Sequence, residues 1–135
     1  MPIDPGPFDI DETRLVIGPN GNASPKPVSP TFYEDLDAEF GDFAGHMLVA
    51  EHSFDAPWPT WEMHPKGDEF VYLLEGDVDL ILWIGSTEKT LRVDMPGTYV
   101  IVPKGTWHTA RPRRPTRMLF LTPGEGTLNA ETPGP

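Results

Sequence analysis

The sequence predicts a single all-β domain, a sandwich or barrel, preceded by a proline-rich arm and one short helix. A chain of 135 residues has the size of one domain with one well-buried core. From residue 43 onward, short apolar, β-branched and aromatic runs recur about every ten residues, with turn residues between them. This spacing is typical of antiparallel strands that close into two sheets or a barrel.

The first 42 residues form the arm and the helix. Residues 1–30 hold seven of the seventeen prolines and one β-branched run, Arg14 to Ile17. A segment so rich in proline cannot hold an internal sheet position, so we expect an extended arm that adds an edge strand to its own barrel or to a partner's. Ser29 and Pro30 suit a helix start, Phe32, Leu36 and Phe40 share one face, and Gly41 ends the helix.

Residues 43–122 form the predicted barrel, and residues 123–135, which are rich in glycine and proline, are predicted to be a flexible tail. Turn residues such as Gly76-Asp77 and Pro103-Lys104-Gly105 punctuate the barrel strands. The expected strands are Met47–Phe54, Trp61–His64, Phe70–Leu74, Val78–Trp83, Thr90–Val93, Tyr99–Val102, Trp107–Ala110 and Met118–Thr122.

Composition and charge exclude several classes of protein. The chain has no cysteine, so a disulfide framework, a thiolate metal site and a cysteine nucleophile are excluded. A net charge of −11 argues against nucleic acid as a partner. No apolar run approaches the roughly 20 residues that span a bilayer, so no membrane association is expected. The first residues resemble no signal peptide, and we expect a cytoplasmic location.

The segment Trp61 to Gly76 holds the densest chemistry of the chain. Residues two apart on a strand share a face, so Glu62 and His64 project together while Trp61 faces the other way. After a turn, Glu69 opens the next strand and can lean back toward the same point. A second segment ends in His108, which completes a set of four ligands if the two strands are neighbours.

Both segments match the two motifs of the cupin family. The chain reads Glu62-x-His64, four residues, Glu69, six residues, Gly76, and then Gly97, five residues, Pro103-x-Gly105, two residues, His108. It therefore resembles a small single-domain cupin, and the resemblance implies a jelly-roll barrel, also called a double-stranded β-helix. Two positions depart from the motifs: Glu62 replaces the usual first histidine, and Pro112 replaces a terminal asparagine.

The resemblance implies a divalent transition metal held by His64, Glu69 and His108, and Glu62 can supply a fourth ligand. Nitrogen and oxygen donors suit Fe, Mn, Zn or Ni, and a proton shared between the two glutamates is the metal-free alternative. Glu62 is either the fourth ligand or a general base. The implied function is a metal-dependent enzyme of oxygenase, isomerase or lyase type on a small molecule, and the alternative is a non-catalytic binding or sensing protein. A homodimer is also implied.

Other residues receive structural interpretations. His46 and His52 match no motif position and are predicted to be surface or satisfied residues. Trp61 and Trp107 are predicted to lie in the core or an interface, whereas Trp58 suits a barrel rim or a packed loop. The basic stretch from Arg111 to Arg117 could steer an anionic substrate, but a solvated turn that balances neighbouring acids is favoured.

Overall fold

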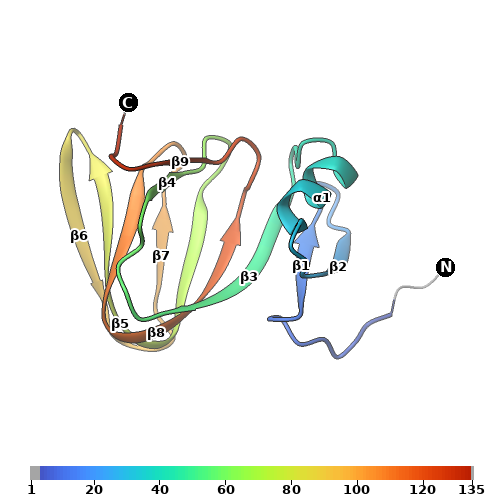
Figure 1. Cartoon of the computed structure of the whole chain (residues 1–135), viewed down its shortest axis with the longest axis horizontal. Helices are drawn as coiled ribbons and strands as arrows, with labels where there is room; N and C mark the ends of the chain where they lie inside the picture. Colours follow the sequence, from blue (N-terminus) through green and yellow to red (C-terminus); the bar gives the residue numbers. More distant parts are fainter. Residues whose placement is uncertain (1–3, 135) are drawn as a thin grey trace.

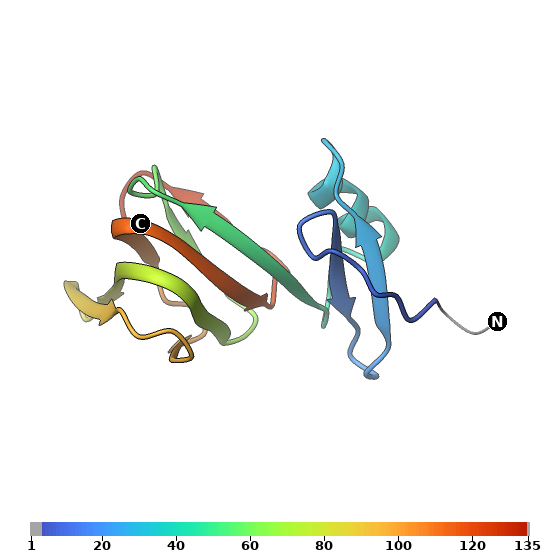
Figure 2. The same cartoon turned by 90° about the horizontal axis from the view of Figure 1, so that it is seen from below.

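The computed structural model describes residues 4–134 and shows a β-barrel with a smaller N-terminal lobe beside it (Figures 1 and 2). The lobe contains β1, β2 and α1, and β3 connects it to the barrel. The elements are β1 Thr13–Ile17, β2 Ala23–Pro27, α1 Phe32–Glu39, β3 Met47–Phe54, β4 Trp61–Met63, β5 Glu69–Ile84, β6 Thr87–Val93, β7 Tyr99–Val102, β8 His108–Thr122 and β9 Leu128–Ala130.

The barrel is built around two long bent strands, β5 and β8, which pair antiparallel along most of their length. The first half of β5 also pairs with β7, and its second half pairs with β6. On the edge away from β5, the C-terminal half of β8 pairs with β3 and its first residue pairs with β4, which in turn pairs with β9. This arrangement confirms the all-β jelly-roll barrel of the prediction.

Alternation along β5 explains the core. On either side of the bend at residues 74–77, every second side chain of this strand is buried, among them Val71, Leu73, Val78 and Leu80, and packs in the barrel interior with Met118 of β8. The period of two is the property of a strand with one face toward a core. A second apolar cluster under α1, which includes Phe32, Leu36 and Leu48, joins the lobe to the inner face of β3.

The expected turn at Gly76-Asp77 is wrong, because the two predicted strands on either side of it form the single strand β5. The chain bends there through register shifts against β8. Gly76 has φ +122° and a Cβ at this position would lie 2.4 Å from Thr116 Oγ1, so the glycine marks a close approach of two strands rather than a reversal. The strands expected at 107–110 and 118–122 likewise merge into β8.

The two chain ends also differ from expectation. The segment after residue 122 is not a free tail, because β9 pairs with β4 in register. Its glycines and prolines shape the turn before β9 instead of leaving the segment unstructured. The helix starts at Phe32 with Thr31 as the N-cap residue, two residues later than a start at Pro30. The arm does add strands, since β1 pairs with β3 of its own chain and β2 forms the edge.

Within residues 4–134, no helix is long and apolar enough to cross a membrane.

Candidate metal centre

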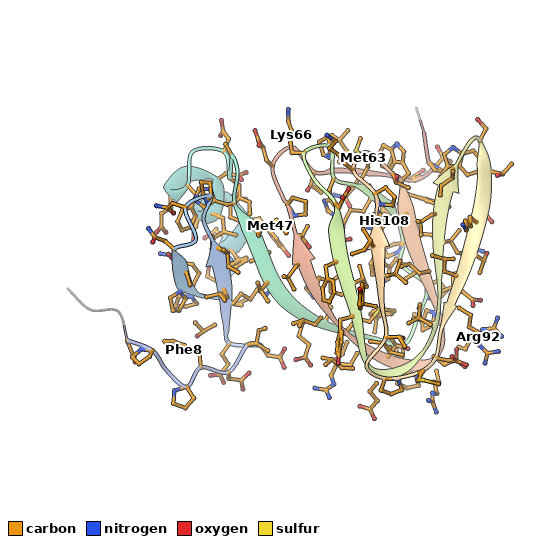
Figure 3. The ribbon with its side chains drawn as sticks, turned by 180° about the vertical axis from the view of Figure 1, so that it is seen from behind. Phe8, Met47, Met63, Lys66, Arg92 and His108 are labelled. Atoms are coloured by element: carbon orange, nitrogen blue, oxygen red, sulfur yellow. The ribbon has the colours of Figure 1, made fainter. Side chains whose placement is uncertain are left out.

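The four residues of the two motifs come from adjacent ends of three strands. Glu62 lies on β4, Glu69 opens β5 and His108 opens β8. Glu62 and His108 are directly opposite each other in the β4–β8 ladder, so strand pairing brings the two motifs together. His108 lies inside the barrel near the end that carries Met63 and Lys66 (Figure 3).

Two hydrogen bonds hold the turns of the two motifs against each other. Gly105 N donates to the carbonyl of His64 at 2.9 Å. Lys104 N donates to the carboxylate of Asp68 at 2.7 Å. Asp68 therefore joins the two turns, and it helps to fix the rim of the site.

The structure brings all four predicted residues into one group, Glu62, His64, Glu69 and His108, here called the four-residue cluster. His64 Nε2 lies 2.8 Å from Glu62 Oε1 and 3.3 Å from Glu69 Oε2, and His108 Nε2 lies 3.2 Å from Glu69 Oε1. One donor atom from each residue lies within 4.8 Å of all the others. Metal bonds of about 2.1 Å place neighbouring donors about 3.0 Å apart at right angles, so these separations match one shared ion.

Hydrogen bonds at the Nδ1 atoms fix the ring orientation and the tautomer of both histidines. His108 Nδ1 donates to the carbonyl of Thr106 at 3.1 Å, and a carbonyl can only accept. Thr127 donates its hydroxyl proton to Gly124 O, so at 2.8 Å it accepts from His64 Nδ1. In the neutral form each Nε2 therefore points a lone pair into the cluster, which is the arrangement of metal-binding histidines.

The cluster is nearly closed to solvent. His64, Glu69 and His108 are at most 4% exposed, whereas the Glu62 side chain is 31% exposed. Thr122 donates to Glu69 Oε2 at 2.6 Å and holds this carboxylate in place. Glu62 is thus the group of the cluster that faces incoming molecules.

Burial and charge act against each other at these groups. Burial lowers the pKa of His64 and His108, but the adjacent carboxylates outweigh it and raise these pKa values to about 9 and about 10. Burial raises the pKa of Glu62 and Glu69, but the two histidines outweigh it and lower both pKa values to about 2. Without a metal, the cluster therefore holds two protons at neutral pH as its compensating positive charge.

Three buried atoms of the cluster have no well-oriented hydrogen-bond partner among residues 4–134: His64 Nε2, Glu69 Oε1 and His108 Nε2. Buried polar atoms are nearly always satisfied, so this concentration needs a cause. A divalent cation at the centre would satisfy all three, and two carboxylates would balance its charge. The residues present therefore fit a divalent transition metal.

A cavity of about 830 Å³ leads to the cluster. Glu62, His64 and Glu69 line it, together with His52 and Trp58. His52 was predicted to be a surface or satisfied residue, and that prediction did not place it at the cavity. Strand β3 turns His52 toward the interior along with Ala50, and its ring packs 5.5 Å from the ring of Phe120. The period of two along β3 was the signal that could have found it.

Thr127 is a second residue that the sequence did not identify. It lies in the segment predicted to be a tail, 63 positions from the histidine that it orients. No local pattern connects them, because the pairing of β9 with β4 creates the contact.

The tryptophans occupy the predicted kinds of position. Trp61 and Trp107 are buried together in a cluster with Ile81 on the outer face of the sheet. Trp58 contacts His108 edge to face at 6.3 Å and forms part of the cavity wall, so it is both rim and packed loop residue. His46 is satisfied by Ala44 O at 2.8 Å and stands away from the site.

The basic stretch balances neighbouring acids, as was favoured, but it lies within strand β8 and not in a turn. Arg113 pairs with Asp79 at 3.1 Å and Arg117 pairs with Glu51 at 2.9 Å across the outer face of the sheet. These arginines do not line the cavity. They balance acids on neighbouring strands.

Comparisons with known proteins agree with this fold. Solved structures with a similar fold include an oxalate oxidase, at 16% identity with TM-score 0.52, covering 61% of this chain and 45% of that chain. An oxalate decarboxylase of Bacillus subtilis matches at 15% identity with TM-score 0.53, covering 62% of this chain and 23% of that chain. The chain thus spans less than half of either neighbour, and identities this low show the fold alone.

A search of curated proteins finds no significant match. The sequence model of the cupin domain family matches residues 45–122, more than half of the chain. These residues run from just before β3 to the end of β8 and include the whole four-residue cluster. The chain therefore belongs to the cupin family.

Proposed function

We propose that this cupin is a metal-dependent enzyme that acts on a small organic molecule in the barrel cavity, by a reaction of oxygenase, isomerase or lyase type. The observation that carries the proposal is the four-residue cluster at the cavity, in which hydrogen bonds at Nδ1 orient both histidines. Perturbed ionisable groups that converge in a cavity mark a functional site. The metal is Fe, Mn, Zn or Ni.

When bound, such an ion supplies a Lewis acid or a centre for dioxygen chemistry. The chain's own residues do the rest. His64, Glu69 and His108 would hold the ion, and Thr106, Thr122 and Thr127 keep these three side chains in position. The wall formed by Trp58 and Phe120 keeps water away from the reacting molecule.

Glu62 has one of two roles in this proposal. Its exposed carboxylate either binds the ion as fourth ligand or takes a proton from the substrate as general base. Glu62→Gln separates the roles: a base predicts unchanged metal affinity with lost turnover, and a ligand predicts weakened metal binding.

The alternative is a cupin that binds a small molecule without converting it. The number of protein donors in the cluster supports this reading for one metal, because four ligands saturate a tetrahedral Zn²⁺. An ion that takes more than four ligands would leave room for a substrate beside these residues. The identity of the metal therefore bears directly on which function is performed.

We also propose a homodimer. On the outer face of the sheet, Tyr99 and Ile101 of β7 are 59% and 45% exposed and lie opposite Tyr72 and Phe70 of β5. The rings of Phe70 and Tyr99 are 4.9 Å apart. A cluster of exposed aromatic and aliphatic side chains supports a protein interface.

The experiment that tests the function has two steps. Protein purified without added metal is reconstituted separately with Fe, Mn, Zn and Ni, and the metal content is measured; we expect one ion per chain and its loss in His108→Ala. Each loaded form is then incubated with small molecules that raise the melting temperature, and the products are analysed. A new product supports the enzyme, recovery of unchanged ligand supports the binding protein, and absence of metal after every reconstitution refutes the metal-dependent enzyme.

A further inference from the structure

The wall of the cavity is largely apolar and aromatic. Trp58 and Phe120 lie next to the cluster, with their rings 6.0 Å apart. Phe43 and Leu36 extend the apolar wall toward α1. With about 830 Å³, the cavity has the volume of sites that hold a ring-sized organic molecule.

The charges that line the same cavity are negative. Asp37, near the end of α1, and Asp42, in the loop after it, lie at the exposed side, and Glu62 and Glu69 lie at the cluster. Among the described residues that line it, none is a lysine or an arginine. Arg14 does not line the cavity. Burial and then the charge of Arg14 lower the pKa of His52. The Arg14 guanidinium lies over the Phe32 ring, 4.9 Å from its centroid.

The four-residue cluster does not offset these acids. Two carboxylates balance a divalent ion, and without an ion the two histidines can at most balance the two carboxylates. A site with three histidines and one carboxylate would keep a positive charge with the same ion. Because Glu62 stands where a histidine is usual, the cluster is formally neutral and Asp37 and Asp42 leave the cavity negative overall.

We infer that the cavity takes an uncharged small molecule with an aromatic or similarly flat apolar body, and that it disfavours carboxylates such as oxalate. Trp58 and Phe120 would contact the flat body. His52, whose pKa burial lowers, is a neutral imidazole on the same wall and can both donate and accept a hydrogen bond. The inference rests on the proposed function, because it assigns a substrate class to the same site.

Benzamide and benzoate test the inference, since they share shape and differ in charge. Binding of each is measured by isothermal titration calorimetry at low ionic strength, to both the metal-loaded and the metal-free protein, with oxalate as a second anion. We expect benzamide to bind at least about tenfold more tightly than benzoate in both forms. Added salt should narrow the difference, because the two aspartates are at the exposed side.

The double variant Asp37→Asn and Asp42→Asn tests the cause. It should reduce the preference for benzamide several-fold, and asparagine suits the left-handed backbone of Asp42 at φ +57°. Glu34→Gln, on α1 but outside the cavity lining, is the matched control and should leave the preference unchanged.

Three results would overturn the inference: equal or tighter binding of benzoate or oxalate, binding of neither probe at millimolar concentration, or an equal effect of the control variant. The metal-free arm keeps this test separate from the proposed function. A protein that retains no metal refutes the proposed function while the charge preference remains measurable.

Discussion

Replacing Thr127 with valine removes the hydroxyl that orients His64 and keeps the shape of the side chain. In the wild type, His64 Nδ1 donates to this hydroxyl at 2.8 Å, and His64 is only 4% exposed, so water cannot easily replace the lost acceptor. A buried donor left without a partner costs about 1–3 kcal/mol. The imidazole is then free to rotate or to carry its proton on Nε2, and Nε2 then no longer presents a lone pair to the cluster.

The loss should appear in metal affinity more clearly than in folding. Outer partners of metal-binding histidines typically contribute 10–100-fold to affinity, which is about 1.4–2.7 kcal/mol. We therefore expect Thr127→Val to weaken metal binding by at least about tenfold in a competition titration against a coloured chelator. The variant should still fold, because the valine fills the same space near β9.

Thr127→Ser is the matched control, because serine keeps the hydroxyl and both hydrogen bonds of Thr127, including its donation to Gly124 O at 2.9 Å. It should bind metal within about twofold of the wild type. Equal affinity for the valine variant and the wild type would refute the reasoning, and so would an equal loss in the serine and valine variants.

Three further predictions follow from the fold and the site. Gly76→Ala should destabilise the protein by about 3–5 kcal/mol in urea titration, because its Cβ would meet Thr116 Oγ1 at 2.4 Å; Gly21→Ala, with φ +85° and open space, should cost only about 1–2 kcal/mol, and equal losses would contradict the close approach. The metal-free protein should have its highest melting temperature between about pH 4.5 and 6.5. The pKa values of the two site histidines, raised to about 9 and about 10, provide stability that is complete below 6.5 and lost as pH rises through those values. The pKa values of the two carboxylates, lowered to about 2, provide stability that is present above 4.5 and lost as pH falls toward 2. A melting temperature that stays flat from pH 6 to 10 would argue against the paired cluster. Tyr99→Ser with Ile101→Ser should convert a dimer into a monomer in light scattering after size exclusion, and an unchanged mass would place any interface elsewhere.

The four-residue cluster could be predicted from the sequence, because short-range spacing and turn residues place its members. Glu62 and His64 are two positions apart on a strand, and the turn residues after His64 return the chain so that Glu69 faces the same point. His108 follows a second turn of the same kind. The alternation of apolar residues also predicted β3 and β7 with their observed ends.

Features that depend on long-range packing were not visible in the sequence. Glycine and aspartate at 76 and 77 are typical turn residues, yet Thr116 packs against them and the chain continues as one bent strand. The composition of the last residues predicted a flexible tail. Instead, β9 pairs with β4, and this pairing brings Thr127 within hydrogen-bond distance of His64 Nδ1. In each case, a partner distant in the sequence overrides the local preference.

The central claim is that the four-residue cluster binds one divalent metal ion, and anomalous X-ray diffraction from crystals of the reconstituted protein at the absorption edge of the metal tests it most directly. The account predicts one anomalous peak per chain, within about 2.0–2.3 Å of His64 Nε2, His108 Nε2 and a Glu69 oxygen. The distance from the peak to Glu62 then decides whether this residue is the fourth ligand or stands beside the ion. A peak at any other place, or no peak in crystals whose protein contains one ion per chain in solution, would contradict the claim.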